Sequence, residues 1–265
     1  MNKHEVAVVI PAYYKSSFSP EELISLKHLN KHLVKYDKFY IVPSNTNTTK
    51  LKQKGFRFIK FPKHYFPSAK TYNKLLLGKN FYHTFLHYRF ILIYQLDALV
   101  FSNKLMKWCG SRYDYIAAPW FGSIIAKLSH KKGSPISGGN GGFSLRNVQK
   151  CLKVLDLVEK SATRSSNKEL VHKLWFTKAV VTGKSHGKWL NAPASNYPFN
   201  EDGFWSLEAP KYLSSFKVAP FKDALKFSFE KYPRKSFELN KHHLPFGTHA
   251  WEKYDKDFWL PYILK

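Results

Sequence analysis

Acidic side chains at the ends of predicted elements are the first residues of this chain that could carry out chemistry. Asp97 follows residues 90–94, an apolar run of branched and aromatic residues without a polar interruption. Such a run is typical of a strand buried on both faces of a mixed sheet. An acid at the carboxyl end of a central strand lies where the crevice of an α/β sheet opens and ligands bind. A turn or capping aspartate is the alternative interpretation.

Glu201 and Asp202 are adjacent acids in an aromatic setting, between Phe199 and Phe204. A carboxylate among apolar rings is costly to ionise, so its pKa rises toward the range that suits a general base. The alternative is an acid pair in the first turn of a helix, capped by Asn200 and stabilised by the helix dipole. The two interpretations are compatible with each other.

Four glycines occupy five consecutive positions, 138–142, and Asn140 is the only other residue among them. Glycine lets the backbone approach a ligand closely and adopt positive φ. The spacing does not fit the Gly-x-Gly-x-x-Gly motif of dinucleotide-binding proteins. The pattern favours a ligand-facing loop over the alternative, a bulged turn before a strand.

His249 follows Pro245-Phe246-Gly247, which predicts a turn rather than the apolar face of a helix. Imidazole, carboxylate and phosphate oxygens together suit a hard divalent cation. Spacing alone does not show that His249 and Asp97 bind one ion, and a lone histidine is more often structural. Four aromatic side chains are candidates either for stacking on a base or sugar or for the core: Tyr13, Trp120, Trp205 and Trp251.

Alternating strand and helix patterns must position these residues. Strands are predicted over residues 6–10, 38–42, 56–61, 90–94, 113–120 and 216–219. Helices are predicted from Pro20, with Ser19 as the cap, and over residues 68–77, 102–108, 147–158 and 169–181. We expect residues 127–137, which are basic and lack an apolar period, to form a loop. This order predicts an α/β fold, one domain over residues 1–265, with a mainly parallel central sheet flanked by helices.

The net charge of +25, from 43 Lys and Arg against 18 Asp and Glu, implies an anionic partner. The lysines are scattered among aromatic residues, and no helix-turn-helix, zinc-finger or RNA-binding signature is present, which excludes sequence-specific nucleic-acid recognition. Two cysteines are too few for a disulfide framework. No signal core begins the chain and no run is long enough to span a bilayer. We therefore expect a cytoplasmic protein, with a peripheral contact to the inner membrane surface through its charge.

Taken in order, these groups resemble the GT-A class of nucleotide-sugar-dependent glycosyltransferases. The closest resemblance is to a little-characterised bacterial, viral and fungal family that carries a glycosyltransferase-like domain of unknown function. The resemblance covers residues 90–252, and its motifs are Gln95-Leu96-Asp97, residues 113–116 with Ala118-Pro119-Trp120, residues 139–146, Asn200-Glu201-Asp202 and residues 245–249.

The resemblance implies a GT-A-like (Rossmann-like) fold, with residues 1–101 as the nucleotide-binding half and residues 102–265 as the acceptor and catalytic half. It implies a nucleotide-sugar donor on Pro11, Tyr13, Gln95 and Asp97. Acceptor or sugar contacts fall on Gly139, Asn140, Gly141, Gly142, Trp120 and Trp205. A divalent cation, Mn²⁺ or Mg²⁺, falls on Asp97 and His249.

In that class the strand-end motif is usually Asp-x-Asp, and here Gln95 replaces the first acid. By resemblance, Asp202 is the base that deprotonates an acceptor hydroxyl in an inverting transfer, and Glu201 is either its partner or a contact to that hydroxyl. The basic surface suits an anionic glycan or a lipid-linked acceptor.

Two other functions compete with this one. The first is a catalytically inert basic α/β module that binds nucleic acid or an anionic membrane, which the charge and the missing acid favour. The second is a sugar-nucleotide hydrolase or pyrophosphorylase, against which the first predicted strand lacks a following glycine-rich phosphate loop. The sequence does not specify the donor, the acceptor or the oligomeric state.

Overall fold

A six-stranded mixed sheet forms the centre of the protein. The computed structural model describes residues 4–13, 17–121, 135–163 and 193–264. The strand order is β3-β2-β1-β4-β7-β6, and all strands run parallel except β7, which is antiparallel to both of its neighbours. The strands are β1 (His4–Pro11), β2 (Asp37–Pro43), β3 (Phe56–Phe61), β4 (Tyr88–Tyr94), β6 (Tyr115–Phe121) and β7 (Pro135–Asn147). The predicted α/β fold with a mainly parallel sheet is confirmed.

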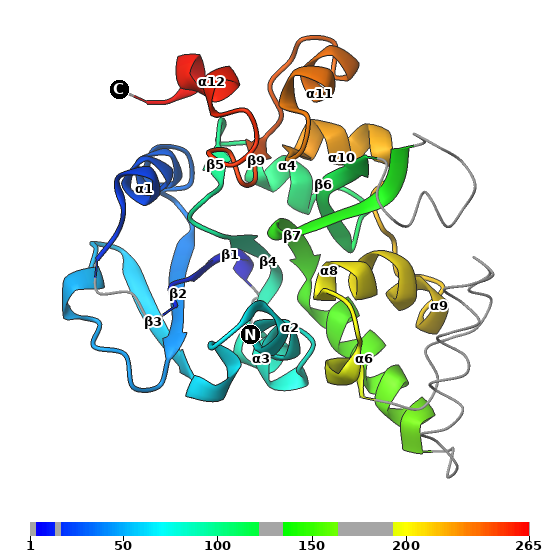
Figure 1. Ribbon diagram of the computed structural model, residues 1–265. Coiled ribbons are helices and arrows are strands. Elements are labelled where there is room, and N and C mark those ends of the chain that lie inside the picture. The colour runs from blue at the N-terminus through cyan, green and yellow to red at the C-terminus, as the bar shows by residue number, and fades with distance from the viewer. Residues whose placement is uncertain (1–3, 14–16, 122–134, 164–192, 265) are drawn as a thin grey trace.

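Alternating residues of the central strands build two separate apolar cores, one on each face of the sheet. Val9 and Ile93 belong to the core that α2 (Ala69–Leu76), α3 (Lys79–Thr84) and α6 (Val148–Thr163) cover. Val8 and Leu92 point to the opposite core, which α1 (Pro20–His32), α4 (Leu105–Cys109) and α10 (Phe221–Phe227) cover. Figure 1 shows the two groups of helices on opposite sides of the strands. Both faces of the sheet are therefore buried, as the uninterrupted apolar runs predict.

The first helix begins where its sequence predicts. The Ser19 hydroxyl accepts a hydrogen bond from the Glu22 backbone N–H at 3.2 Å, and the Glu22 carboxylate accepts one from the Ser19 N–H at 3.0 Å. Pro20 occupies the first helical position, where its missing N–H costs nothing. This reciprocal capping box orients α1 so that Leu26 and Leu29 enter the core.

A second, three-stranded sheet lies beside the main one and is built from very short strands. β5 (Leu99–Val100) pairs antiparallel with β9 (Gly247–Thr248), which pairs parallel with β8 (Ser228–Phe229). The remaining helices are α8 (Glu201–Gly203), α9 (Ala209–Tyr212), α11 (Pro233–Leu239) and α12 (Lys256–Trp259). Short helical turns are η1 (Thr49–Leu51), η2 (Lys63–Tyr65), η3 (Ala194–Asn196), η4 (Phe204–Glu208) and η5 (Leu260–Tyr262).

Several sequence-based expectations are corrected by the structure. The glycine segment lies inside β7 and not in a loop, and residues 135–137 of the predicted basic loop begin the same strand. Residues 127–134 and the predicted helix 169–181 lie outside the described residues. Around residues 216–219 only one isolated bridge, between Tyr115 and Val218, replaces the predicted strand. The helix predicted over 68–77 is followed by a second one, α3, that the pattern did not indicate.

The strand order reverses between β1 and β4. β2 continues the sheet on the far side of β1, whereas β7 continues it on the far side of β4. In open α/β sheets the crevice at such a point, beyond the carboxyl ends of the strands, is where ligands bind. Pro11 ends β1 and Tyr94 ends β4, so the segments that follow them face this crevice.

Two further expectations concern the cysteines and the membrane. Cys109 and Cys151 are both free and buried, as expected of thiols packed like small apolar side chains. Among the residues that the structure describes, no helix combines the length and apolar character that a bilayer crossing requires.

Candidate active site

A tight turn after β4 brings Asp97 to the carboxyl edge of the sheet. The Ala98 N–H donates to the Gln95 carbonyl at 2.9 Å, and the Gln95 N–H donates to the Gly142 carbonyl of β7 at 2.9 Å. On the other side, the Trp251 N–H donates to the Asp97 carbonyl at 3.1 Å. The backbone of Asp97 is thus fixed between β7 and the C-terminal segment, as a strand-end binding residue requires.

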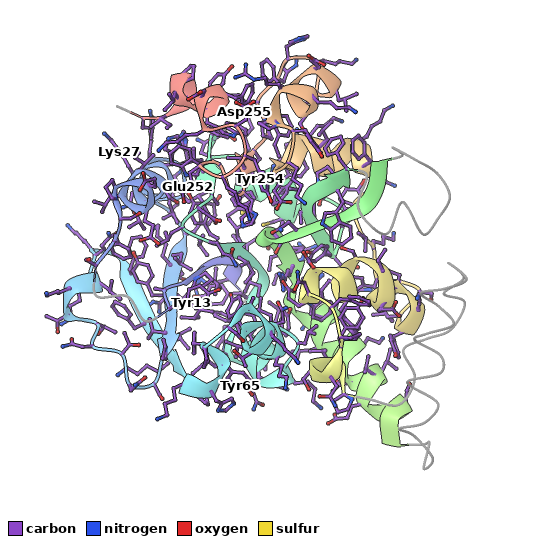
Figure 2. The ribbon with its side chains drawn as sticks, viewed as in Figure 1. Tyr13, Lys27, Tyr65, Glu252, Tyr254 and Asp255 are labelled. Atoms are coloured by element: carbon purple, nitrogen blue, oxygen red, sulfur yellow. The ribbon has the colours of Figure 1, made fainter. Side chains whose placement is uncertain are left out.

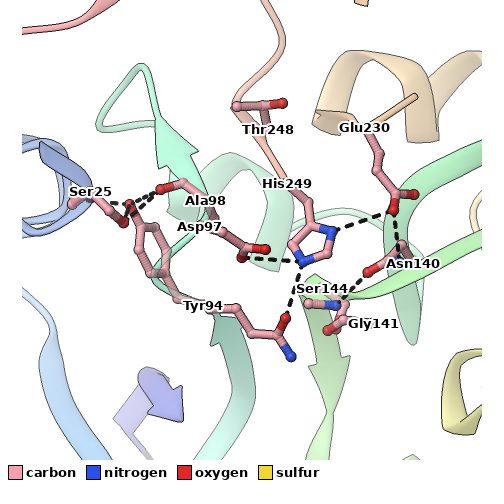
Figure 3. A network of polar contacts seen from close by, with 12 residues as sticks. Ser25, Tyr94, Asp97, Ala98, Asn140, Gly141, Ser144, Glu230, Thr248 and His249 are labelled. Atoms are coloured by element: carbon pink, nitrogen blue, oxygen red, sulfur yellow. Dashed lines mark hydrogen bonds and ion pairs between the residues drawn. The ribbon is translucent and has the colours of Figure 1, made fainter. Parts of the chain in front are cut away.

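His249 lies directly against Asp97, although 152 positions separate them in the sequence. Its Nε2 is 3.3 Å from Asp97 Oδ1 and 3.1 Å from Gln95 Oε1. The pairing of β9 with β5 creates this contact, because His249 follows β9 and Asp97 precedes β5 (Figure 3). The structure thus brings together Asp97 and His249, the two residues on which the resemblance places a cation, and puts Gln95 beside them.

Glu230 completes this cluster and was missed by the sequence analysis. Its Oε1 is 3.6 Å from His249 Nδ1 and accepts a hydrogen bond from Asn140 Nδ2 at 2.9 Å. Asn140 Oδ1 in turn accepts from the Gly142 N–H at 2.9 Å (Figure 3). The only signal for Glu230 was an acid between an aromatic residue and a lysine in a basic part of the chain.

The imidazole of His249 is held between two carboxylates, and this decides its charge. Burial alone lowers the pKa of a histidine, but the contacts with Asp97 and Glu230 outweigh it and raise the pKa of His249 to about 10. For Asp97, burial raises the pKa, yet the neighbouring His249 brings it below its ordinary value. Without a bound ligand the cluster therefore consists of an imidazolium between carboxylates.

Arg146 and Glu201 form a second cluster on the opposite side of β7. Arg146 Nη1 donates to Glu201 Oε2 at 2.7 Å, and Nη2 donates to Oε1 at 2.8 Å. Both side chains are buried, with exposed fractions of 0% and 5%. Ser144 Oγ accepts a hydrogen bond from Arg146 Nε at 3.0 Å, which orients the guanidinium within β7. The ion pair with Glu201 then joins β7 to α8. Both oxygens of Glu201 are occupied by this pair.

Asp202, the next residue, has a different environment. Its Oδ1 accepts a hydrogen bond from the Gly203 N–H at 2.7 Å. Burial and the adjacent charge of Glu201 raise the pKa of Asp202 to about 7. Asn200 precedes the short helix in an extended conformation without capping it through its side chain, and instead accepts from Asn73. Asp202 is therefore a carboxyl group whose proton is exchangeable near neutral pH.

The glycines of β7 make room for these side chains. A Cβ on Gly141 would lie 2.1 Å from Glu201 Oε1, and a Cβ on Gly142 would lie 2.0 Å from His249 Nε2. Position 139 must also be glycine, here because of the neighbouring backbone: a Cβ would lie 2.0 Å from the Ala118 carbonyl oxygen of β6. The expected close approach is real, but its partners are the protein's own acids, imidazole and backbone rather than an open ligand loop.

Tyr13 links the two clusters electrostatically. It follows β1 at the strand-order reversal, and burial together with the charges of Asp97 and Glu201 raises its pKa to about 12. The pKa of Glu252 is raised by burial and by the charges of Glu21 and Asp97. Figure 2 labels both residues: Tyr13 extends from the end of β1, and Glu252 lies in the C-terminal segment. Asp97 therefore influences the pKa of both residues, which come from opposite ends of the sequence.

The predicted stacking residues divide into two groups. Trp120, in β6, is partly exposed. Its ring lies close to Gly138 of β7, since a Cβ on that glycine would be 3.2 Å from the ring. Trp205 and Trp251 are each 0% exposed. Trp205 contacts Phe216 and Tyr82 in the core, so its ring offers no free face to a sugar. Its assignment as a sugar-binding residue is withdrawn, and Trp251 belongs to the core for the same reason.

A divalent cation is the cofactor that the sequence resemblance implies. Among the described residues, no three His, Cys, Asp or Glu side chains form a metal site. The donors of His249, Asp97 and Gln95 nevertheless contact one another at 3.1 and 3.3 Å. Adjacent ligands of a small divalent ion are about 3 Å apart, and Asp97 Oδ1 is buried without a hydrogen-bond donor. Gln95, Asp97 and His249 are thus the side chains that would hold such a cation, with Glu230 orienting the ring.

Residues 55–249 match the family described as protein of unknown function DUF5672. The chain belongs to this family. The match confirms the expected relationship to a domain-of-unknown-function family. No curated protein matches the chain.

Solved structures of several transferases are similar to this chain, all at low sequence identity. It is 12% identical to the galactosyltransferase LgtC in complex with donor and acceptor sugar analogs, over 92% of this chain and 86% of that one, with a TM-score of 0.48. It is 14% identical to the glycosyltransferase GlyE of Streptococcus pneumoniae TIGR4, over 98% and 60%, with a TM-score of 0.46. It is 10% identical to mouse xyloside xylosyltransferase 1, over 93% and 97%, with a TM-score of 0.49. Because these TM-scores are below 0.5, we argue the chemistry from the site itself.

Proposed function

We propose that this DUF5672 protein is a glycosyltransferase that moves a sugar from a nucleotide-sugar donor to an acceptor hydroxyl with inversion. The observation that carries this function is the pairing of two unlike clusters across β7. One holds an imidazole between carboxylates, His249 with Asp97 and Glu230. The other holds a carboxyl group poised near neutral pH, Asp202, beside an occupied ion pair.

The donor nucleotide fits the crevice between β1 and β4. Pro11 and Tyr13 border it from the end of β1, and Gln95 and Asp97 border it from the end of β4. Crevices at a reversal of strand order bind nucleotides in many α/β proteins because the strand ends leave room for a ligand there. Tyr13 carries a neutral phenol, which is suited to hydrogen bonding with a base or ribose.

Asp202 is the residue we assign as the general base. An acceptor hydroxyl oxygen attacks the anomeric carbon and forms the new glycosidic bond, while the bond from that carbon to the diphosphate breaks. The hydroxyl proton passes to Asp202 in this step. A carboxylate with a pKa of about 7 is a better proton acceptor than an ordinary aspartate. At a pH equal to this pKa, half of the molecules still carry the ionised form.

Glu201 acts as a positioning residue. Its ion pair with Arg146 holds the start of α8 against β7, which fixes the adjacent Asp202. Its negative charge also raises the pKa of Asp202, after the larger contribution of burial.

Asp97, His249 and Gln95 are the residues that would hold a divalent cation, which supplies positive charge to the departing diphosphate. When no cation is bound, the imidazolium of His249 provides positive charge at the same place. Because Asp97 and Glu230 offset the charge of the imidazolium, the bound cation is what would give this cluster its attraction for a diphosphate.

The two clusters argue against the competing function, a catalytically inert binding module, because such a module does not need them. Burying Arg146 with Glu201 and keeping a carboxyl group such as Asp202 in a desolvated position both cost folding free energy. The basic surface that favours such a module is also compatible with a transferase that acts on an anionic or lipid-linked acceptor.

Thermal unfolding with UDP, GDP, CDP, dTDP and ADP, each with and without Mn²⁺ or Mg²⁺, tests the proposal. A ligand at a hundredfold excess over its Kd stabilises the native state by about 2.7 kcal/mol. We expect one nucleoside diphosphate to raise the unfolding temperature, and the matching nucleotide sugars then to release that diphosphate when an acceptor is present. Stabilisation by no nucleotide would contradict the proposal, and release of a nucleoside monophosphate would indicate a hydrolase.

A further inference from the structure

A second concave site lies away from the candidate active site, and none of the catalytic residues lines it. It has a volume of about 740 Å³ and is formed by α4, α10 and the segment between α11 and β9. Figure 1 shows these elements together on one side of the molecule, beyond the short sheet of β5, β8 and β9. We refer to it as the basic groove. Its lining comprises Phe101, Ser102, Lys104, Lys107, Trp108, Phe221, Lys222, Leu225, Lys226 and residues 239–241 and 243–246.

The rim of the basic groove is positively charged. Five lysines line it, namely Lys104, Lys107, Lys222, Lys226 and Lys241, together with His243. Among the described lining residues there is no Asp or Glu. Lys226 contacts Asp223 at 3.3 Å, and no described carboxylate lies within ion-pair distance of the other four ammonium groups. Uncompensated charge of one sign around a concavity attracts an anion.

The floor of the basic groove is apolar and rigid. Trp108, Phe227 and Phe246 pack against one another beneath it, with Trp108 and Phe246 reaching the lining. Backbone hydrogen bonds of 2.9 Å, from Phe101 to Phe246 and from Phe246 to Lys226, hold the floor in place. Leu239 at the edge is 51% exposed, and Met106 on α4 is 49% exposed. Of these two, Leu239 lines the groove, where it continues the apolar surface formed by Phe221, Leu225 and Leu244. A contiguous apolar surface is suited to an apolar partner.

We propose that the basic groove binds an anionic lipid, with its phosphate among the lysines and part of its acyl or prenyl chain on the apolar floor. A ligand that is only anionic would contact the lysine-lined rim and not the apolar floor, and a ligand that is only apolar would leave the lysines without a partner. A free phosphate would leave the apolar part of the lining without a partner. A glycan needs polar side chains for its hydroxyl groups, and the described lining offers only one hydroxyl and one carboxamide, those of Ser102 and Asn240. A membrane lipid supplies both the anion and the apolar chain.

The position of the groove relates it to the candidate active site. β5 and β9 connect them: Asp97 and His249 flank one end of this two-residue ladder, and Phe101 and Phe246 flank the other. Asp97 and Phe101 are four positions apart in the sequence, which corresponds to no more than about 13 Å of extended chain. The assignment of this lipid as the carrier of the sugar acceptor rests on the proposed function, whereas lipid binding itself does not.

Vesicle flotation of the full chain tests the inference. Vesicles of phosphatidylcholine alone are compared with vesicles of phosphatidylcholine and phosphatidylglycerol in equal parts. The groove variant is Lys104→Glu with Lys222→Glu, two exposed positions at the starts of α4 and α10, where acidic residues are favourable to a helix. The matched control is Lys52→Glu with Lys54→Glu, which changes the net charge equally at exposed positions before β3.

We expect the wild type and the control to bind anionic vesicles, and the groove variant to bind them at least about tenfold more weakly, as the loss of two lysines at a membrane surface predicts. Leu239→Ser should also weaken binding, and glycerol 3-phosphate should not compete. Equal losses in the groove variant and the control would overturn the proposal, because general charge would then explain binding. Competition by glycerol 3-phosphate, or binding to DNA or acidic polysaccharide in place of vesicles, would overturn it as well.

The same variants separate this inference from the proposed function. Stabilisation by a nucleoside diphosphate should be unchanged in the groove variant, because none of its substitutions lies in the crevice between β1 and β4. Vesicle binding without any nucleotide effect would therefore support the lipid site and contradict the transferase.

Discussion

Arg146 and Glu201 form a buried ion pair in which two parallel hydrogen bonds, of 2.7 and 2.8 Å, join the guanidinium to the carboxylate. The pair connects β7 to the start of α8 and occupies both carboxylate oxygens. Glu201 is therefore unavailable as a proton acceptor. The hydrogen bonds described for the Asp202 side chain come instead from the backbone, from Gly203 and Gly141, and no described side chain pairs with it as a cation. This contrast, which depends on the three-dimensional arrangement, distinguishes the roles of two adjacent acids.

Glu201→Gln should destabilise the protein strongly. Removing one charge of a buried ion pair leaves the other, here Arg146, without compensation, and such changes cost about 3 to 5 kcal/mol. Denaturant unfolding of the variant measures the loss. The control Glu238→Gln, at an exposed position, should change the free energy of unfolding by about 0.5 kcal/mol or less. Equal stability of Glu201→Gln and the wild type would show that the pair contributes nothing to the fold.

Asp202→Asn should abolish sugar transfer and preserve donor binding. The amide has nearly the same shape as the carboxyl group but does not accept the hydroxyl proton, and general-base catalysis is worth about 10² to 10⁴ in rate. The rate of transfer and the stabilisation by the nucleoside diphosphate are measured on the same preparation. Transfer at the normal rate would remove Asp202 from the role of base, and loss of both properties would point to a structural defect instead.

The same variant should gain stability relative to the wild type as the pH rises. The pKa of Asp202 is raised from 3.8 to about 7 by burial and by Glu201, so between these values the native state binds more protons than the unfolded state. The wild type therefore loses stability as the pH increases from 4 to 7, by at most about 4 kcal/mol, and Asp202→Asn does not. Unfolding temperatures of both proteins across this range measure the difference, and two parallel curves would contradict the raised pKa.

Local patterns predicted the parts of the fold in which one signal dominates. The buried run before Asp97 formed β4, and the Ser19 and Glu22 capping box began α1, because each depends on a few neighbouring residues. The glycine segment was predicted as a ligand-facing loop because glycine allows close approach of the backbone and positive φ, but in β7 the space is filled by side chains from distant elements. Such compensation is not visible in a local pattern.

The sequence indicated some residues of the candidate site and not others, because some of them are brought in by long-range contacts. Asp97, Asp202 and His249 carry chemistry that a sequence pattern can indicate. Glu230 contributes through a two-residue strand, β8, whose pairing with β9 is a long-range contact without a periodic signal. Trp205 was a candidate both for ligand stacking and for the core, which is the more common place for a lone tryptophan, and its contacts with Tyr82 and Phe216 place it in the core.

Asp97→Ala should weaken nucleotide binding and metal binding together. The substitution removes the carboxylate that contacts His249 at 3.3 Å, so both the donor set and the charge of the imidazole change. Calorimetric titration with the stabilising diphosphate and with Mn²⁺ measures the two affinities. Asp156→Ala, which removes an exposed aspartate paired with Lys79, is the control and should leave both unchanged. An unaltered affinity for the diphosphate in Asp97→Ala would exclude this residue from the donor site.

Gly142→Ala should disable the imidazole cluster without removing any of its groups. The new Cβ would lie 2.0 Å from His249 Nε2 and 2.6 Å from Gln95 Oε1, so the ring must move away from Asp97. Overpacking of this kind costs about 1 to 3 kcal/mol, and we expect the stabilisation by diphosphate to be lost as well.

Gly110→Ala is the matched control for that variant, because its Cβ meets no atom closer than 3.5 Å and its φ of −77° suits alanine. Unfolding temperatures with and without the diphosphate are compared for both proteins. Gly110→Ala should behave like the wild type in each condition. If Gly142→Ala retained the full response to the diphosphate, the contact between His249 and Asp97 would not be required for donor binding, and Asp97 would have to act independently of the ring.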